Sequence, residues 1–394
     1  MPVGIVGAAI VGLVVSLVAA CESGTRPPKQ GPARPHPQVP VSSVYPTAAE
    51  VRDAGVGAID TTASGEIMYG KLCAPCHGAT GQGYAADNAP SLVTTTFLES
   101  ATDDFLHHSI AGGRPGSSMG AYGKVIGGPL DDLAIDRIVA FLRAKGPAAK
   151  ALEAPGKGDA TAGAKLYGEM CVSCHGNTGQ RSTAVHLANA QFLTSATDAF
   201  LKYAITNGRP GTKMLAFGTV LKPQQIDDVT AYIRSFLVGV TTQAELLPEP
   251  TGKEPLVLNP GGKDPAFQPR ENRFVPIDQI AVAYKAKRKM IIIDARPPSE
   301  WRRVHIKGAV SIPYHDTTRL ADVPKDVYVL AYCACPHHLS GEVVDALVKL
   351  GHPHAYIIDE GINEWHRRLL PVDAAPGVQP PPKEPPVDTG LPVK

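Results

Sequence analysis

The sequence predicts a multidomain protein in which two all-α domains are followed by an α/β domain with a central parallel sheet. Two similar domains are predicted because a cysteine motif occurs twice, beginning at Cys73 and at Cys171. Each copy also ends in a stretch with apolar residues at helical spacing. The α/β domain is predicted because short apolar runs beyond residue 273 alternate with segments long enough for crossover helices.

The duplicated motif reads Cys-x-x-Cys-His in both copies. A single Cys-x-x-Cys is also typical of a zinc knuckle or a redox dithiol. Here each motif is preceded by the same Tyr-Gly pair and followed by a glycine, so the surroundings are duplicated too. This pattern favours covalent haem attachment, in which two thiols bind the vinyl groups and the imidazole binds the iron. The predicted attachment residues are Cys73, Cys76 and His77 in the first copy and Cys171, Cys174 and His175 in the second.

A second shared pattern predicts the sixth ligand of each iron. The pattern Gly-Arg-Pro-Gly-x-x-Met occurs at residues 113–119 and 208–214, so Met119 and Met214 align. Methionine usually fills gaps in a core, but its paired occurrence after the same tetrapeptide favours ligation. A thioether ligand raises the potential of the iron, so both sites are expected to pass electrons rather than to hold oxygen.

With these motifs, residues 61–147 and 158–238 resemble class I c-type cytochromes. The resemblance implies a small helical fold and two covalently bound haem c groups. Neither methionine is followed by the proline that is common in that family. The final helices agree with the resemblance, since Asp131 or Asp132 can cap the first of them. The apolar stripes predicted for these helices are Leu133, Ile135, Ile138, Val139 and Leu142, and Ile226, Val229, Ile233, Phe236 and Leu237.

The N-terminal segment predicts a membrane anchor. Residues 2–20 are almost wholly apolar, and residues 18–21 resemble a bacterial lipoprotein processing box in which Cys21 would be lipidated. No lysine or arginine precedes the run, so an uncleaved membrane span is the alternative. Both routes place the remainder outside the cytoplasmic membrane, where proteins of this kind acquire their haem. We therefore expect an extracytoplasmic, membrane-anchored protein.

Proline-rich stretches separate the expected units, because such stretches cannot build a core and act as extended tethers. The formal net charge of +1 indicates no nucleic-acid partner. The expected divisions are a lipoprotein-type signal or anchor at 1–21, a tether at 22–60, helical domains at 61–147 and 158–238, a linker at 239–272, the α/β domain at 273–373 and a proline-rich tail at 374–394.

Ordered motifs distinguish the α/β domain. Its predicted strands cover residues 290–294, 327–332 and 355–359, and an Asp-Ala-Arg sequence at 294–296 begins at the end of the first. A Tyr-Cys pair ends the second strand, and a Glu-Gly pair follows the third. In this order the motifs resemble a rhodanese domain. The resemblance implies that Cys333 is the thiolate that attacks a sulfur donor and holds the transferred sulfur as a persulfide. A following helix N-terminus would favour that thiolate.

The loop after Cys333 departs from the rhodanese pattern, because it lacks arginine and reads Ala-Cys-Pro-His-His-Leu. One interpretation is a dithiol site, in which Cys335 resolves a persulfide or sulfenate on Cys333. Another is a copper(I) or zinc site that includes His337 and His338. The third is a rhodanese fold without activity, whose loop binds a partner or an anion.

Two functions therefore remain open for this electron carrier. In the first, Cys333 takes up sulfane sulfur from a small sulfur compound such as thiosulfate or a polysulfide, and oxidation of the bound sulfur supplies electrons to the haems. The protein would then be a sulfurtransferase or a sulfur-compound oxidoreductase. In the second, it shuttles electrons between redox partner proteins of a respiratory chain, and the third domain only docks or senses.

Overall fold

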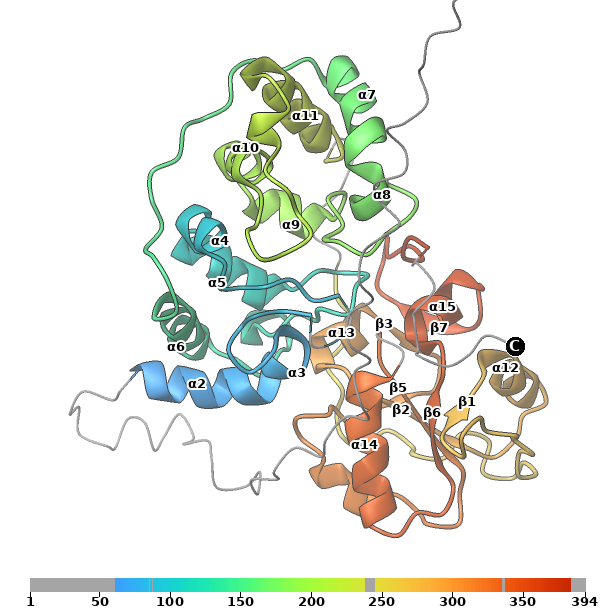
Figure 1. Cartoon of the computed structure of the whole chain (residues 1–394). Helices are drawn as coiled ribbons and strands as arrows, with labels where there is room; N and C mark the ends of the chain where they lie inside the picture. Colours follow the sequence, from blue (N-terminus) through green and yellow to red (C-terminus); the bar gives the residue numbers. More distant parts are fainter. Residues whose placement is uncertain (1–60, 85, 87, 238–244, 335–336, 384–394) are drawn as a thin grey trace, which may run out of the picture. The chain divides into compact units, whose positions relative to one another are not determined.

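The computed structural model describes residues 61–394 except 85, 87, 238–244, 335–336 and 384–394 (Figure 1). The described residues all lie in the compact unit Ala58–Lys394. The expected anchor and tether, with Cys21, lie outside them, as does Cys335. Within the described residues, no helix has the length and apolar character needed to cross a membrane.

The first helical domain is built around the crossing of its first and last long helices. Helix α2 packs against α6, and Gly65 makes the close approach possible, because a Cβ there would lie 2.0 Å from the carbonyl oxygen of Arg137. Asp131 caps α6 by accepting a hydrogen bond from the Ala134 amide, as predicted. The helices are α2 (Thr61–Leu72), α3 (Ala74–His77), α4 (Thr95–Ser100), α5 (Asp103–Gly112), η2 (Lys124–Ile126) and α6 (Asp132–Arg143).

The second helical domain repeats this arrangement. Helix α7 packs against α11, and Gly163 takes the place of Gly65, since its Cβ would lie 2.0 Å from the carbonyl oxygen of Asp228. The duplication seen in the sequence is therefore also a duplication of the helix crossing. The helices are α7 (Ala160–Met170), α8 (Val172–His175), α9 (Ala190–Ser195), α10 (Asp198–Asn207), η3 (Phe217–Thr219) and α11 (Pro223–Ser235).

The predicted stripes form most of the helical core, with one correction. Leu133 is 51% exposed, whereas the other four residues of the first stripe are buried. Leu133 lies in the first turn of α6, two residues from Ile135, and therefore faces away from α2. In the second stripe Ile226, Val229 and Ile233 are buried, and Phe236 lies just beyond the end of α11.

The third domain contains a five-stranded parallel sheet in the order β1-β6-β5-β2-β4. The three predicted strands are confirmed as β2, β5 and β6, each slightly shorter than expected, and a β3–β7 pair runs antiparallel. The elements are β1 (Phe274–Val275), α12 (Ile277–Lys285), β2 (Ile291–Asp294), α13 (Pro298–Arg303), β3 (Val304–Ile306), β4 (Val310–Ser311), η4 (Thr318–Asp322), β5 (Val329–Tyr332), α14 (His338–Lys349), β6 (Ala355–Ile358), α15 (Gly361–Arg367) and β7 (Val372–Ala374).

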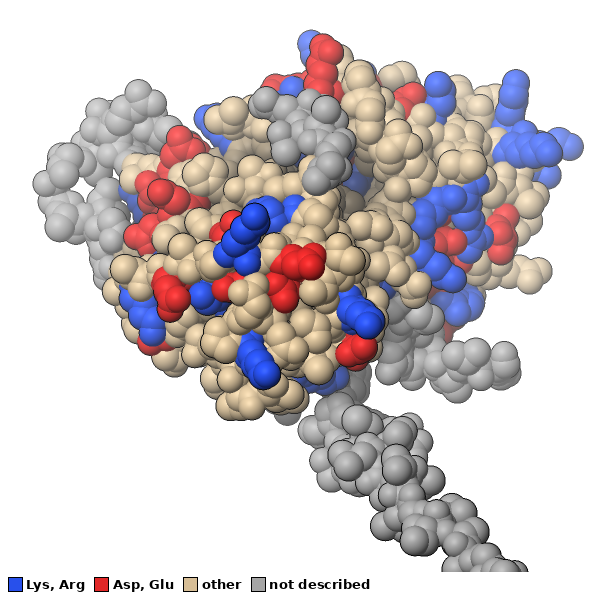
Figure 2. Space-filling view, turned by 90° about the horizontal axis from the view of Figure 1, so that it is seen from above, with Lys and Arg blue, Asp and Glu red and all other residues tan. Residues whose placement is uncertain are grey.

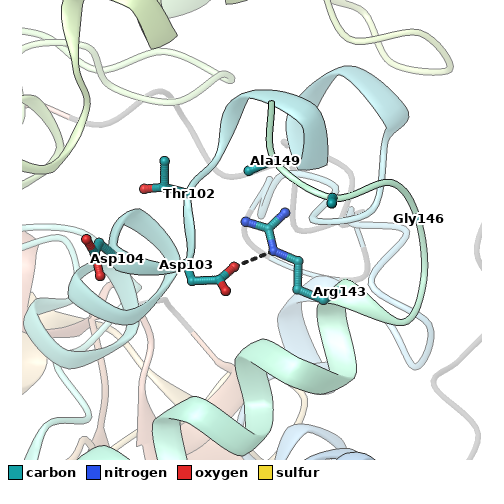
Figure 3. A pocket seen from close by; sticks show the side chains of 7 residues that line it. Thr102, Asp103, Asp104, Arg143, Gly146 and Ala149 are labelled. Carbon is teal, nitrogen blue, oxygen red and sulfur yellow. Dashed lines mark hydrogen bonds and ion pairs between the residues drawn. The ribbon is translucent and has the colours of Figure 1, made fainter. Parts of the chain in front are cut away.

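The described surface carries charges of both signs. On the face shown in Figure 2, lysine and arginine side chains are interspersed with aspartate and glutamate, and wide uncharged areas separate them. A cavity of about 620 Å³ opens on the first helical domain, between Thr102 and Asp104 on one side and Gly146 and Ala149 on the other (Figure 3). None of the predicted ligands or reactive cysteines lines this cavity.

Candidate functional site

Each Cys-x-x-Cys-His motif forms a single helical turn directly after a longer helix. The amide of His77 donates a hydrogen bond to the carbonyl oxygen of Cys73 (2.9 Å), and His175 makes the same bond to Cys171 (2.9 Å). Two thiols and one imidazole are thereby held on one short turn in each domain. The described cysteines carry unbridged thiols, as attachment to haem vinyl groups requires.

A tyrosine fixes each of these turns. The hydroxyl of Tyr69 donates to the carbonyl oxygen of Gly78 (2.9 Å), and that of Tyr167 donates to Gly176 (2.8 Å). Burial is the main cause that raises the pKa of both tyrosines, so both remain neutral donors. The tyrosines of the duplicated Tyr-Gly pairs therefore have a structural role.

The imidazole rings are oriented by backbone carbonyls. The Nδ1 atom of His77 lies 2.8 Å from the Pro90 oxygen, and that of His175 lies 2.7 Å from the Val185 oxygen. An N–H at Nδ1 leaves Nε2 with a lone pair for a metal ion. Burial lowers the pKa of both histidines, which favours this neutral, ligating form. The donor set thus fits haem iron. Sequence analysis did not identify these two carbonyl oxygens as acceptors, because the identity of a residue as proline or valine does not indicate what its backbone carbonyl binds.

The Gly-Arg-Pro-Gly-x-x-Met segment closes a tight loop around the predicted sixth ligand. The Arg114 amide donates to the Met119 carbonyl oxygen (2.8 Å). The hydroxyl of Ser117 donates to the Arg114 carbonyl oxygen (2.6 Å) and accepts from the Met119 amide (3.2 Å). In the second domain Thr212 makes the equivalent pair of bonds. Sequence analysis missed this hydroxyl, although a Ser or Thr three residues after each arginine was its signal.

The two attachment turns differ in exposure. His77 is buried and Cys76 is half-buried, whereas His175 is half-buried and Cys174 is exposed. Burial raises the pKa of Cys73 to about 12, compared with about 11 for Cys171. The first site is therefore the more enclosed of the two.

The α/β domain contacts the first site directly. The Cys76 sulfur lies 3.9 Å from Nδ1 of His338, and the Tyr122 and Tyr314 hydroxyls lie 3.0 Å apart. Next to the Met119 loop, the Ala121 amide donates to Oε1 of Glu300 (3.3 Å). These contacts join both the attachment turn and the methionine loop of the first domain to the third domain.

Cys333 directly follows β5, as predicted, and its side chain is fully buried. Its sulfur lies 3.4 Å from the hydroxyl oxygen of Ser340 in the first turn of α14. Cys335 falls outside the described residues, so the dithiol hypothesis remains a prediction. Among the described residues, no group of three or more His, Cys, Asp and Glu side chains is arranged to hold a metal ion.

The two histidines of the loop have different partners. Nε2 of His337 lies 2.8 Å from Oδ1 of Asp359, which also pairs with Arg270, and the His337 ring packs on Phe274. Although burial acts to raise the pKa of Asp359, the bonds from His337 and Arg270 lower it overall. His338 instead faces Cys76. The structure therefore separates the two imidazoles that the metal hypothesis would bring together.

Comparison with known proteins identifies three domains. Residues 60–142 and 158–233 match the family model "Cytochrome C oxidase, cbb3-type, subunit III", and residues 279–368 match the rhodanese-like domain model. Cbb3-type cytochrome c oxidase subunit FixP of Azorhizobium caulinodans is 31% identical over 180 residues, which cover 44% of this chain and 59% of that protein. This chain therefore spans about three fifths of the length of that relative.

Two further proteins are similar to parts of this chain. A probable adenylyltransferase/sulfurtransferase MoeZ of Mycobacterium tuberculosis is 36% identical over 87 residues, which cover 21% of this chain and 22% of that protein. A reducing HAO-like protein complex of Kuenenia stuttgartiensis matches 46% of this chain and 100% of its own, at 19% identity and a TM-score of 0.32. The family matches and the duplicated sites show that the chain is a tandem c-type cytochrome with two haem c groups, followed by a rhodanese-like domain.

Proposed function

We propose that this protein is a membrane-tethered, extracytoplasmic electron carrier whose rhodanese-like domain delivers electrons from sulfane sulfur. The observation that carries the proposal is the direct contact between the first haem attachment turn and the loop that follows Cys333, through Cys76 and His338. The first haem attachment turn and the start of α14, which follows the loop that would bind sulfur, lie in one compact unit, and this supports the proposal. The apolar N-terminal segment supports the tether, and the FixP relative supports redox partners in a respiratory chain.

The matching geometry of the two attachment turns and of the two methionine loops supports an assignment of the residues that would hold the two haems. We assign thioether attachment to Cys73 and Cys76 and to the equivalent pair in the second domain, Cys171 and Cys174. The axial ligands would be His77 with Met119, and His175 with Met214. When bound, the two haems would each accept one electron. Together these equal the two electrons that a persulfide releases when water supplies the oxygen atom, RSS⁻ + H₂O → RSSOH + H⁺ + 2 e⁻.

The methionine assignment has a direct test. Met119→Ala should leave both haems attached, because attachment depends on the cysteines, but should lower the potential of one haem. Potentiometric titration of the visible spectrum measures this. Met170→Ala is the matched control, since that methionine lies on α7 and outside the Gly-Arg-Pro-Gly loops. An unchanged potential in Met119→Ala would refute the assignment.

The sulfur step begins at Cys333. Its thiolate would attack the outer sulfur of thiosulfate and release sulfite, RS⁻ + S–SO₃²⁻ → RSS⁻ + SO₃²⁻. The Ser340 hydroxyl can donate to the thiolate, and the N-terminus of α14 favours negative charge at this place. His337 is held by Asp359 and Phe274 at the start of the same helix.

The proposal is tested by the visible spectrum of the oxidised protein before and after thiosulfate or polysulfide is added. Wild type should become reduced, and Cys333→Ser should not. Both proteins keep Cys174 and the other attachment cysteines, so they should contain the same amount of haem. Measuring the haem content of each protein is therefore the internal control. Equal reduction in both proteins would show that the reagent reaches the haems without Cys333, which would overturn the sulfur step.

One observation favours the second candidate, a plain electron shuttle with a docking domain. The Cys333 side chain has no exposed surface, so a sulfur donor has no direct access to its sulfur in this structure. If neither wild type nor Cys333→Ser is reduced by sulfur compounds, while both exchange electrons with a redox protein, the docking role is the correct one.

A further inference from the structure

Cys333 and Asp359 directly follow β5 and β6, at the carboxyl ends of two neighbouring strands. The strands pair in parallel with Ala331 opposite Ile357, two positions before these residues. Ala331, Ile357 and Cys333 pack in the core on one face of the sheet. Side chains alternate between the faces of a strand, and the Asp359 amide still donates a hydrogen bond to the Val275 oxygen of β1 (3.1 Å), so Asp359 is placed on the same face. The thiol and the carboxylate are therefore neighbours across the strand pair.

Helix α14 covers this face and places a third group at the same edge. Leu339 in its first turn packs in the same core as Cys333. The hydroxyl oxygen of Ser340 lies 3.4 Å from the Cys333 sulfur. His337, the residue directly before the helix, places Nε2 2.8 Å from Oδ1 of Asp359. A thiol, an imidazole and a carboxylate therefore lie together at the edge where β5, β6 and α14 converge.

Asp359 holds the ring of His337 in one orientation. Its carboxylate bonds to His337 through Oδ1 and to Arg270 through Oδ2. Although burial acts to raise the pKa of Asp359, these bonds lower it overall, so the carboxylate stays ionised. It therefore accepts the proton of Nε2, which leaves the lone pair of the ring on Nδ1. The ring also packs on Phe274, with ring centres 4.3 Å apart, so the protein sets the direction of Nδ1.

Water has access to this ring, because the His337 side chain is 26% exposed whereas that of Asp359 is only 6% exposed. In the described part of the chain, the ring is hydrogen-bonded through Nε2 and not through Nδ1. The neighbouring imidazole has a separate place, since His338 is directed to Cys76 of the first attachment turn. His337 is thus a base that a carboxylate orients, next to the cysteine that would carry sulfur.

The two steps of the proposed sulfur reaction make different demands on the protein. Formation of the Cys333 persulfide from thiosulfate needs a thiolate and releases sulfite without a proton transfer. Oxidation of the persulfide adds an oxygen atom from water, so another group must accept a proton from that water. An imidazole oriented by a carboxylate is the usual general base for such a transfer. The oxidation step therefore needs a group of the kind that His337 provides.

We propose that His337 is the general base of the oxidation step. Its Nδ1 takes a proton from water while the water oxygen bonds to the outer sulfur of the Cys333 persulfide, RSS⁻ + H₂O + His → RSSOH + HisH⁺ + 2 e⁻. The two electrons pass to the two haems, one to each. Asp359 is the positioning residue, because its charge orients the ring and stabilises the imidazolium that forms. The inference rests on the proposed sulfur function and assigns a residue to its second step.

The test compares two activities of the full haem-loaded chain in wild type and in His337→Gln. Transfer of sulfur to cyanide, RSS⁻ + CN⁻ → RS⁻ + SCN⁻, needs the persulfide alone and is measured as thiocyanate. Reduction of the haems by thiosulfate without cyanide needs the oxidation as well and is measured in the visible spectrum. His337→Gln should slow this reduction by about 100-fold or more, the usual effect of a general base, and should slow thiocyanate formation much less. The Cys333 persulfide should accumulate in the variant, which mass spectrometry of the peptide detects.

Two further variants separate basicity from charge and from general damage. His337→Arg keeps a cation that cannot accept a proton, so its haem reduction should be as slow as that of His337→Gln. His354→Gln makes the same substitution directly before β6, at the amino end of that strand, where the His354 ring packs on Tyr328. It should behave as wild type does. Recovery of haem reduction in His337→Arg would show that the residue acts through its charge, and this would overturn the inference.

The remaining outcomes distinguish this inference from the proposed function. Equal haem reduction in His337→Gln and wild type, with thiocyanate formed by both, would overturn the inference and leave the proposed function intact. Loss of thiocyanate formation together with haem reduction would also overturn it, since His337 would then act before the persulfide exists. A wild type that forms thiocyanate but is not reduced by thiosulfate would refute the proposed function, and this inference would fail with it.

Discussion

The hydroxyl oxygens of Tyr122 and Tyr314 lie 3.0 Å apart, although 192 positions separate the two residues in the chain. Both hydroxyls also lie 3.3 Å from the carbonyl oxygen of Leu72, the residue before the first attachment cysteine. The two hydroxyls and this carbonyl therefore connect three parts of the protein. Tyr122 follows the Met119 loop, Leu72 precedes the attachment turn, and Tyr314 belongs to the rhodanese-like domain.

Tyr314→Phe should lower the free energy of unfolding by about 1 kcal/mol, because it removes a buried hydrogen bond between two domains. Denaturant titration followed by tryptophan fluorescence measures the loss. Tyr284→Phe is the matched control, since its hydroxyl donates to the Lys307 carbonyl oxygen at an exposed place within one domain. A larger loss in Tyr284→Phe than in Tyr314→Phe would contradict this account of the contact.

The same tyrosine predicts a dependence of stability on alkaline pH. Burial is the largest cause that raises the pKa of Tyr314 in the folded protein, so the folded state holds the hydroxyl proton more tightly than the unfolded chain does. Its contribution to stability is complete below about pH 10, the ordinary tyrosine pKa, and declines as the pH rises above that value. Tyr314→Phe should make the decline shallower. Unfolding at a series of pH values from 8 to about 11 tests this, and an unchanged slope would be evidence against it.

The backbone at position 113 requires a glycine. Its φ is +60°, and a Cβ there would lie 2.5 Å from backbone atoms of Gly120, next to Met119. Gly113→Ala should cost roughly 1–3 kcal/mol and displace the methionine loop, so the visible spectrum should change with the unfolding midpoint. Gly70→Ala is the control, because a Cβ at this position in α2 meets nothing within 4 Å. It should be neutral or stabilise by up to about 1 kcal/mol.

The buried ion pair of the rhodanese-like domain predicts a large loss. Arg296 donates to both carboxylate oxygens of Asp294 (2.9 and 2.7 Å), and both side chains are buried. Arg296→Met should destabilise the protein by about 3–5 kcal/mol, because it leaves a buried carboxylate without its cation. Arg273→Met removes a half-exposed pair with Asp345 and should cost about 1 kcal/mol or less. Thermal unfolding compares the two, and similar losses would refute the distinction.

Much of this arrangement follows from local sequence patterns. The Cys-x-x-Cys-His turns, the Asp131 cap and the three predicted parallel strands depend on spacing, capping and runs of apolar residues, which a sequence displays directly. Leu133 was placed on the wrong face because the first turn of a helix projects residues toward both solvent and core, and spacing alone does not separate them.

The contacts between domains were outside the reach of sequence reasoning. Nothing local marks Tyr314 as a partner of Tyr122, or His338 as a neighbour of Cys76, because these pairs depend on how separately folded units pack. The carbonyl oxygens that accept hydrogen bonds from the axial histidines were not predicted for a similar reason. Every residue has a carbonyl, so only three-dimensional structure selects Pro90 and Val185.

The unequal enclosure of the two attachment turns has a consequence for maturation. Enzymatic addition of haem needs access to both thiols of a motif, and the rhodanese-like domain lies against Cys76 through His338. We therefore expect the first haem to be attached before that domain docks, whereas Cys174 is exposed in the docked chain. The order of the chain is consistent with this, since the first motif precedes the segment that contacts it by 262 positions (Cys76 to His338). Biogenesis of this protein is thus expected to be sequential, with haem loading ahead of domain closure.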